Sequence, residues 1–479
     1  MSYTEGGELD RRATALLERY RSPAVLLNRP FPPHSAPFGR TFFGGLPTLP
    51  DGLEWPRTSG GVPLHFLCQV DCTEIEWRTP LPDHGILFFF GRDDQEQIWG
   101  SDTPADDCRV LYAPEVLGSQ GPSELLVDLP PIGWDYPRTP FRDISLEGDA
   151  PPQLHVKWPA QPLRMDSFAD ASGLPPVVHH QNRAARRFAR EFKARKLLRR
   201  FFPRISPFPK VDASSPDDPV WEHYDHVLPI ARATALENAT GRQPFEDRLV
   251  FGWLDAARLM FDEEAFPQFW IFVHYFARAA LRRHRSNGLF DHPAPTPEEL
   301  AERARADDQL DQEAKGWFDR SCSVPLDATP SDDERRAFRT WAGNIDRRPD
   351  HPVPGSRALE WLQTAAIWAV REWAGNRDFA TKLPSSAYEC AADLFHLVSV
   401  QRGEDKAWYH FQFSQMLGHA AASQEAKPAD GPEICLLNIA SDRGLGWSFG
   451  DAGECSFWIM PSDLAARDFS RVRGTIEGH

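Results

Sequence analysis

The stretch Ile434-Cys435-Leu436-Leu437-Asn438-Ile439-Ala440 decides the fold of this chain of 479 residues. Side chains of a strand point alternately to its two faces, and this run is apolar on both, so it requires burial on both sides. The C-terminal part of the chain adds only one similar apolar run, at residues 455–460, and a candidate strand at 471–476. The strands that complete the sheet must therefore come from elsewhere in the sequence.

The N-terminal part of the chain carries the complementary strands. Extended or strand-like runs occur at residues 24–27, 64–70, 86–90 and 109–112, with turn residues such as those at 82–85 between them. Neither end of the chain has enough strands to cover both faces of a sheet alone. We therefore expect the two ends to pair their strands in one β-containing domain.

Between these ends the apolar pattern changes to helical periodicity. A linker rich in Pro, Ser and Asp at residues 203–219 comes before most of it. Helices are expected at residues 227–237, 244–261, 265–285, 296–319, 331–345, 356–373 and 385–400. Thr296 and Ser331 are each followed three residues later by Glu, which is the spacing of a capping box at a helix start.

These patterns predict an α+β fold in three parts. Residues 10–156 and 411–479 form the two halves of a split β-rich domain, and residues 157–410 form a mainly α-helical domain inserted between them. Insertion at a surface loop costs little closure entropy when the ends of the inserted domain lie close together.

The composition limits the kinds of partner and the location that we expect for the chain. Its net charge of −16 disfavours nucleic acid and anionic membrane, and either attracts a basic protein partner or serves solubility alone. No stretch approaches the roughly 18 to 20 apolar residues that span a bilayer. Residues 1–12 carry acidic side chains where a signal peptide needs a positive end, and the seven cysteines are irregularly spaced. We therefore expect a cytoplasmic protein with reduced thiols.

Two sets of motifs, one in each half, match a known pattern. The first set is Phe43-Gly44-Gly45-Leu46-Pro47, Leu49-Pro50, Trp55-Pro56 and the strands at 66–71 and 85–89. The second set is Leu417-Gly418-His419, Gln424, Leu436-Leu437, Gly450-Asp451-Ala452-Gly453, Phe457-Trp458-Ile459 and residues 463–469. In this order the motifs resemble the YwqG-like family, a widespread bacterial family of largely uncharacterised domains. The resemblance covers roughly residues 10–156 and 411–479.

The resemblance also bears on function. Members of this family are reported among toxin and immunity gene clusters, so the resemblance implies a non-enzymatic protein-binding module. The specific candidate is an immunity protein that neutralises a cognate toxin. The alternative is an enzyme or a small-ligand-binding protein that uses a cleft in the YwqG-like domain. In a third hypothesis the helical middle is the functional part and the β-rich domain is its scaffold.

Six side chains are candidates for binding in such a cleft. They are Gln69, Asp71, Asp442, Trp447, Asp451 and Glu454. Gln69 and Asp71 share one face of a predicted strand, where they line a cleft or serve the fold. The segment 442–454 sets carboxylates and an indole between two apolar strands, which suits a cation, a sugar or a basic side chain. The same Asp and Gly residues are also ordinary in hairpins.

A basic amphipathic helix is predicted in the otherwise acidic chain. Residues 183–204 hold ten Lys or Arg residues against the single Glu191. The residues proposed for contact are Arg183, Arg186, Arg187, Arg190 and Lys193. This helix has four candidate partners: the acidic surface of its own chain, another protein, an anionic membrane and nucleic acid.

Several apparent motifs fail on spacing. The glycines at 444, 446 and 450 are one residue too widely spaced for a dinucleotide loop, and no helix follows them at once. Cys68 and Cys72 lie too far apart along a strand to share a metal, and His223 and His226 have no further ligand at helical spacing. No Walker loop, nucleophile elbow or zinc-protease motif occurs. We expect no cofactor and no metal.

Overall fold

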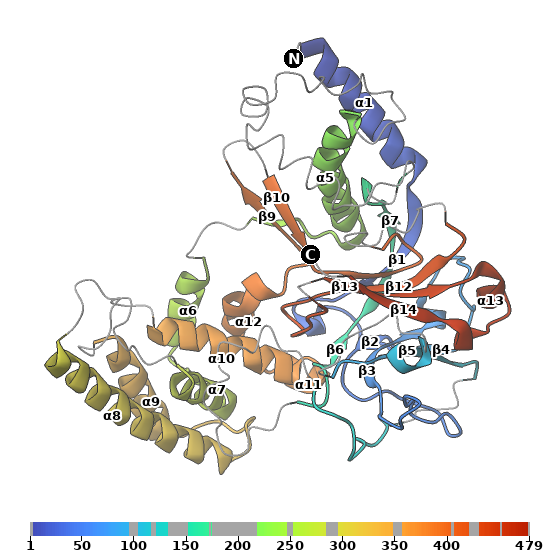
Figure 1. The fold of residues 1–479 in the computed structure, drawn as a ribbon. Coiled ribbons are helices and arrows are strands. Elements are labelled where there is room, and N and C mark those ends of the chain that lie inside the picture. The colour runs from blue at the N-terminus through green and yellow to red at the C-terminus, as the bar shows by residue number, and fades with distance from the viewer. Residues whose placement is uncertain are drawn as a thin grey trace.

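The computed structural model of the protein describes residues 3–94, 104–115, 121–132, 152–171, 174, 218–246, 252–283, 296–347, 357–403, 407–420, 431–450 and 453–477. Within them the chain forms three β-sheets and a group of helices that lies between the two β-rich ends in the sequence (Figure 1). The fold is α+β, as the sequence predicts.

The largest sheet joins the two ends of the chain. Its six strands run in the order β14 (Arg473–Glu477), β13 (Glu454–Ile459), β12 (Ile434–Ala440), β11 (Ser414–Met416), β1 (Ser22–Asn28) and β7 (Gln161–Ser167). All neighbours are antiparallel, and β1 pairs with β11 with Val25 opposite Met416. The predicted β-rich domain split between the chain ends is confirmed.

The second sheet is built from the N-terminal part alone. Its five antiparallel strands run in the order β5 (Cys108–Ala113), β4 (Ile86–Gly91), β3 (His65–Asp71), β2 (Phe42–Phe43) and β6 (Trp158–Pro159). One face meets the six-stranded sheet, where the rings of Phe89 and Phe457 lie 5.3 Å apart. The other face packs under Trp55, whose Nε1 donates to the carbonyl of Leu64 at 2.8 Å. Both faces of this apolar sheet are therefore covered.

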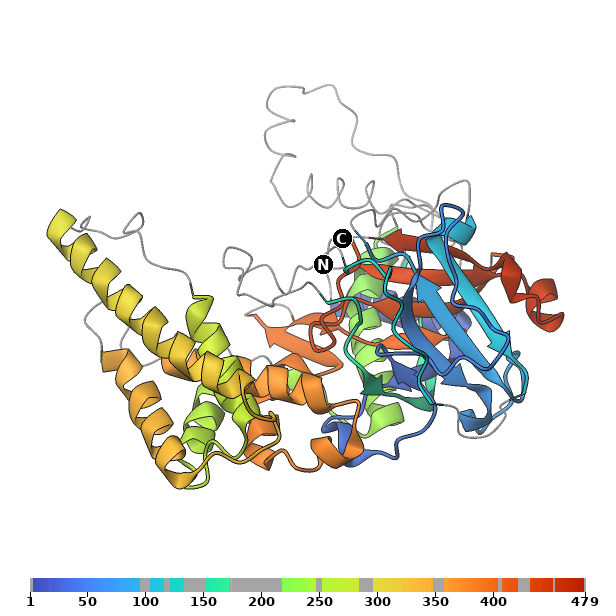
Figure 2. The ribbon, with the colours of Figure 1, turned by 90° about the horizontal axis from the view of Figure 1, so that it is seen from below.

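Helices form most of the described residues between the two β-rich segments. They are α5 (Val220–Thr240), α6 (Gly252–Asp262), α7 (Trp270–Leu281), α8 (Pro297–Cys322), α9 (Asp332–Asn344), α10 (Arg357–Trp373), α11 (Arg377–Ala380) and α12 (Ser385–Ala391). The capping boxes predicted at Thr296 and Ser331 are both formed. Both views place α7 to α10 on one side of the sheets (Figure 1 and Figure 2). Outside this segment lie α1 (Tyr3–Arg19) and the short helices α2 (Pro104–Asp107) and α13 (Pro461–Ala465).

One hydrophobic core runs through the sheets and the helices. It contains Leu27 and Phe43 from the sheets together with Phe276 of α7 and Leu362 of α10. The helix α7 is buried around nearly its whole circumference, which is typical of a helix at the centre of a bundle. The helical part is therefore packed against the β-rich domain through continuous apolar contact.

The structure corrects two predicted helices and places strands inside the predicted helical range. A three-stranded sheet in the order β10 (Ala407–Phe411), β9 (Val398–Arg402) and β8 (Phe245–Glu246) takes residues predicted helical at 244–261 and 385–400. Val398 and Val400 are buried and Ser399 between them is only partly buried, which is a strand period that the longer apolar run hid. The strands β6 and β7 also lie within residues 157–410 and pair with β2 and β1. The domain boundaries themselves stay a prediction.

Candidate functional site

Gln69 and Asp71 lie on β3 and are both buried. Gln69 Oε1 accepts from the backbone N–H of Thr48 at 3.0 Å, and Gln69 Nε2 donates to the carbonyl of Arg40 at 2.8 Å. Asp71 Oδ1 accepts from the N–H of Thr73 at 2.9 Å, and Asp71 Oδ2 lies 2.5 Å from Arg40 Nη2. Both side chains therefore brace the segments that precede and follow their strand.

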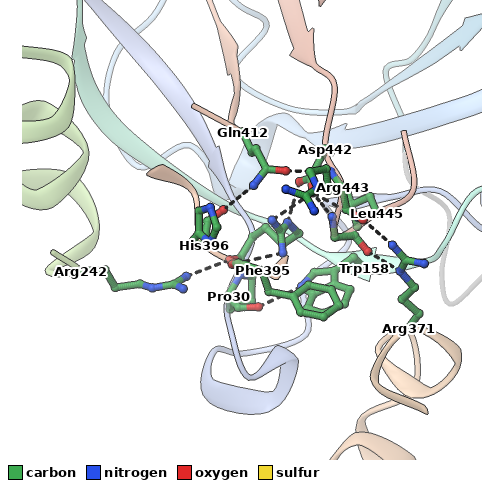
Figure 3. A network of polar contacts seen from close by, with 12 residues as sticks. Pro30, Trp158, Arg242, Arg371, Phe395, His396, Gln412, Asp442, Arg443 and Leu445 are labelled. Carbon is green, nitrogen blue, oxygen red and sulfur yellow. Dashed lines mark hydrogen bonds and ion pairs between the residues drawn. The ribbon is translucent and has the colours of Figure 1, made fainter. Parts of the chain in front are cut away.

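Asp442 is the counter-ion of a buried arginine. Arg29 donates two hydrogen bonds to its carboxylate, from Nε to Oδ2 at 2.9 Å and from Nη2 to Oδ1 at 3.2 Å (Figure 3). Asp442 Oδ1 also accepts from the backbone N–H groups of Gly444 at 2.8 Å and Leu445 at 3.1 Å. Arg29 is 1% exposed and Asp442 is 6% exposed. A two-pronged pair of this kind is among the strongest polar contacts in proteins, and each partner depends on the other for neutralisation.

Aromatic rings complete the surroundings of Arg29. The guanidinium carbon lies 5.4 Å from the ring centroids of both Trp158 and Phe395. These two rings stack on each other with centroids 4.9 Å apart, and Trp158 Nε1 donates to the carbonyl of Pro30 at 2.9 Å. The negative faces of aromatic rings attract a cation, so the buried guanidinium is stabilised beyond its ion pair.

The loop that holds Asp442 is also tied to the helical part. Arg371 of α10 donates from Nε to the carbonyl of Gly444 at 2.8 Å and from Nη2 to the carbonyl of Arg443. Gln412 Oε1 accepts a hydrogen bond from the backbone N–H of Arg443 at 2.8 Å, and Gln412 Nε2 donates one to the carbonyl of His396 at 3.3 Å. We call the contacts of Arg29, Asp442, Arg371 and Gln412 the Arg29 network (Figure 3). It connects the N-terminal strand β1, the helical part and the C-terminal hairpin.

Trp447 lies in the same loop and packs against a buried histidine. Its backbone pairs with that of Asp442 through two hydrogen bonds of 3.1 and 2.9 Å, so the two residues face each other across a tight turn. Its ring centroid lies 5.3 Å from that of Phe43 and 5.5 Å from that of His155. Trp447 Nε1 is buried and has no hydrogen-bond partner among the described residues. The indole is thus an apolar anchor that retains an unused donor.

His155, Asp93 and His65 form a buried polar cluster that the sequence reasoning missed. His155 Nε2 lies 3.1 Å from Asp93 Oδ2, and the N–H of Asp93 donates to His65 Nδ1 at 3.2 Å. His65 Nε2 donates to the carbonyl of Pro130 at 2.9 Å, which fixes a neutral imidazole. Burial is the largest cause that lowers the pKa of His65. Within the described part of the chain, Nδ1 of His155 has no hydrogen-bond partner and no ion-pair contact.

Glu454 marks the base of the hairpin between β12 and β13. Its Oε2 accepts a hydrogen bond from Asn438 Nδ2, and Ser456 Oγ donates to Asn438 Oδ1 at 2.8 Å. The N–H of Ser441 donates to the carbonyl of Gly453 at 2.9 Å, which continues the ladder toward the turn. Asp451 lies outside the described residues. Among the described polar side chains of residues 442–454, Asp442 and Ser448 are buried, whereas Arg443 is exposed.

The structure brings together some of the predicted site residues and separates others. Asp442 and Trp447 meet in one turn, and Glu454 lies at the base of the same hairpin. In the β2–β3 pair, Phe42 is opposite Gln69 and Phe43 is opposite Cys68. Opposite residues share a face, and it is Phe43 that contacts Trp447, so Gln69 points to the other side of the sheet. Gln69 and Asp71 therefore do not share a cleft with the hairpin residues.

Nucleophilic and metal chemistry finds little support in the described residues. Burial raises the pKa of the thiols of Cys68, Cys108 and Cys455, and raises that of Cys72 to about 12. In the part of the chain that the structure describes, no group of three metal-ligating side chains converges. His223 instead contacts a carboxylate of the N-terminal helix. The basic helix with Arg183, Arg186, Arg187, Arg190 and Lys193 lies outside the described residues.

Comparison with models of known families identifies the family of the chain. The model of a family described as a domain of unknown function (DUF1963) matches residues 41–198 and 357–477, together more than half of the chain. The unmatched residues between them contain α7, α8 and α9. No curated protein matches the chain. Among the helices in the described ranges, none has the length and apolar character that crossing a membrane requires.

Proposed function

Because this chain belongs to the DUF1963 family, whose description assigns no activity, we propose a function from its own surface: a non-enzymatic protein-binding module. We propose further that the matched segments are the unit that resembles the YwqG-like family. The exposed face of the β9–β10 hairpin is the observation that carries the binding proposal.

The β9–β10 hairpin has one packed face and one open face. Tyr409 and Phe411 of β10 pack against the hydrophobic cluster formed with α1 and α5. Trp408, which precedes Tyr409 and points to the opposite face of the strand, is 57% exposed and stands opposite Gln401 of β9. The strand β10 is also the terminal strand of its sheet within the described residues. An exposed tryptophan on an edge strand is suited to a protein partner, because buried tryptophans dominate interface energies and edge strands accept a further strand.

The expected partner is a basic protein. The net charge of −16 attracts positive charge over a longer range than any single contact does. A toxin of basic character that is neutralised by this chain in the bacterial cytoplasm is the specific candidate, and it rests on the family resemblance. Such an interaction weakens as salt screens the charges.

The binding proposal is tested by affinity purification of the tagged full-length protein from its native host, at low and high salt. Trp408→Ser should lose the partner, whereas Leu259→Ser, on α6 and 64% exposed, should retain it. A reproducible basic partner retained by Trp408→Ser, or the absence of any reproducible partner, would contradict the proposal. Immunity is tested separately, by co-expression with toxins encoded beside the gene.

A small-ligand site is the second candidate, and the cluster of His155, Asp93 and Trp447 favours it. Asp93 next to His155 Nε2 sets the proton on that nitrogen, which leaves Nδ1 as an acceptor. Trp447 Nε1 is a donor without a partner. One hydroxyl group can accept from the indole and donate to the imidazole. Buried polar groups are ordinarily satisfied, so this pair points to a hydroxyl-bearing ligand or a water.

Thermal shift of the full-length protein with a panel of small polyols and sugars separates these cases. A ligand that binds here should raise the unfolding temperature of the wild type but not that of Trp447→Phe, which lacks the donor. Equal shifts in both proteins, or no shift with any compound, would leave the protein-binding function as the better account.

A further inference from the structure

Lys157 is a partly buried lysine between β6 and the glycine pair that follows β2. Its ammonium lies over the ring of Phe42, with Nζ 4.4 Å from the ring centroid. Phe42 belongs to the cluster on the outer face of the five-stranded sheet. The side chain therefore has an aromatic neighbour and restricted contact with solvent.

Two glycines make the space that the lysine stem occupies. A Cβ on Gly45 would come within 2.9 Å of Lys157 Cβ and Cδ, and a Cβ on Gly375 would come within 2.8 Å of its Cβ and Cγ. Gly45 comes from the N-terminal motif and Gly375 from the turn after α10. Any side chain at either position would push the stem aside. Segments far apart in the sequence thus leave a slot that fits this one side chain.

The slot gives the amine no counter-ion. Among the described residues, no carboxylate lies within ion-pair distance of Lys157, and burial lowers its pKa. Lys382 is the natural comparison, because its Nζ lies 4.7 Å from the ring centroid of Phe379 but also 3.3 Å from Asp327 Oδ2. The two lysines share an aromatic neighbour and differ in the carboxylate.

We propose that Lys157 is a site of covalent acylation by small thioesters. Its neutral amine attacks the thioester carbonyl, the new C–N bond forms, and the C–S bond breaks. The departing sulfur takes up the proton that the amine loses, so the products are an amide and a free thiol. Only a neutral amine is nucleophilic, and a desolvated lysine without an anionic partner supplies more of it than a paired lysine does.

The charge of the product selects this reaction over carboxylation of the same amine. An amide is neutral, so its formation removes a charge that burial disfavours, at the loss of the attraction between the ammonium and the ring of Phe42. A carbamate formed with carbon dioxide would place an anion in the slot without a counter-ion among the described residues. Charge-neutral acylation is therefore the modification that fits the surroundings.

The test treats the full-length protein with a limiting amount of S-acetyl-N-acetylcysteamine and measures acetylation of each lysine by peptide mass spectrometry. Lys157 should react at least about threefold faster than Lys382, although the Lys382 side chain is 41% exposed. An equal or slower rate at Lys157 overturns the proposal. This comparison needs no variant, so it stands whatever the folding of the variants.

Two variants test the cause. Gly375→Ala should bring the rate at Lys157 down to that of Lys382, and Gly45→Ala, whose Cβ would meet the same stem, replaces it if the first variant does not fold. Retention of the rate difference in the folded variant means that the slot plays no part and overturns the proposal. Lys157→Met, which keeps the length without the charge, should leave Tm unchanged or higher. A fall of more than about 4 °C would show that the fold needs the ammonium and would equally overturn it.

Discussion

Replacement of Arg29 by Met should destabilise the protein by about 3 to 5 kcal/mol. Methionine keeps a long apolar stem but removes both hydrogen bonds to Asp442 and the cation between Trp158 and Phe395. Asp442 would then be a buried carboxylate with only the backbone N–H groups of Gly444 and Leu445 as partners. Against a total stability of about 5 to 15 kcal/mol, this loss is a large fraction.

A surface pair supplies the matched control. Arg57 lies 2.5 Å from Asp128, but the side chains are 39% and 59% exposed, so Arg57→Met should cost far less than Arg29→Met. Asp442→Asn keeps an acceptor for the backbone N–H groups and removes the charge. The double variant Arg29→Met, Asp442→Asn should therefore cost less than the sum of the single variants by about 2 kcal/mol.

The assay is urea unfolding followed by tryptophan fluorescence, with the free energy of unfolding extrapolated to water. The reasoning is refuted if Arg29→Met costs within about 1 kcal/mol of Arg57→Met, or if the losses of Arg29→Met and Asp442→Asn simply add. Either result would mean that the buried pair stabilises the fold no more than the surface pair does.

Three further outcomes are expected. Burial lowers the pKa of His274 and of His396 to about 4. Since a histidine in the unfolded chain has a pKa of about 6.5, the unfolded chain binds more protons than the folded one as the pH drops from 6.5 to 4. The free energy of unfolding should therefore fall, by about 2 kcal/mol per histidine at pH 5, and urea midpoints at pH 7 and pH 5 check this. Gly44→Ala should cost at least about 2 kcal/mol more than Gly52→Ala in the same assay, because both have positive φ but only at Gly44 would a Cβ collide with backbone. Of the seven free cysteines only Cys322 is exposed, so Ellman's reagent should release one equivalent of thiolate from the native protein and none from Cys322→Ser; a second rapid equivalent would contradict the buried positions.

The sequence predicts the elements whose local pattern and tertiary setting agree. The run at β12 is apolar on both faces, and the structure buries it between β11 and β13. Both capping boxes form because their hydrogen bonds depend only on residues three positions apart. The segment that became β9 reads as a helix because apolar residues before it continue the helical spacing. Its pairing with β10 and β8, which sequence periodicity does not reveal, made it a strand.

Some contacts of the candidate site follow from the local sequence, and others arise only in the folded protein. Asp442 and Trp447 are five positions apart in one loop, so their proximity follows from the hairpin pattern alone. Arg29, Asp93 and His155 meet those two residues only through the packing of the sheets, and no local motif marks them. Asp93 follows directly on a predicted strand, which is the one signal that could have drawn attention to it. Unpaired charges beside strand ends deserve a search for partners in distant segments.

The Arg29 network also has a consequence for the time at which the chain can fold. Asp442 follows Arg29 by 413 positions, so a ribosome that adds about 5 to 20 residues per second makes the counter-ion about 20 to 80 s after the arginine. The strand β7, which pairs with β1, is made much earlier and can protect one edge of it. The other edge, and the guanidinium itself, must wait for β11 and the C-terminal hairpin. During synthesis the N-terminal segment is therefore a substrate for chaperones, and completion of the fold is a post-translational event.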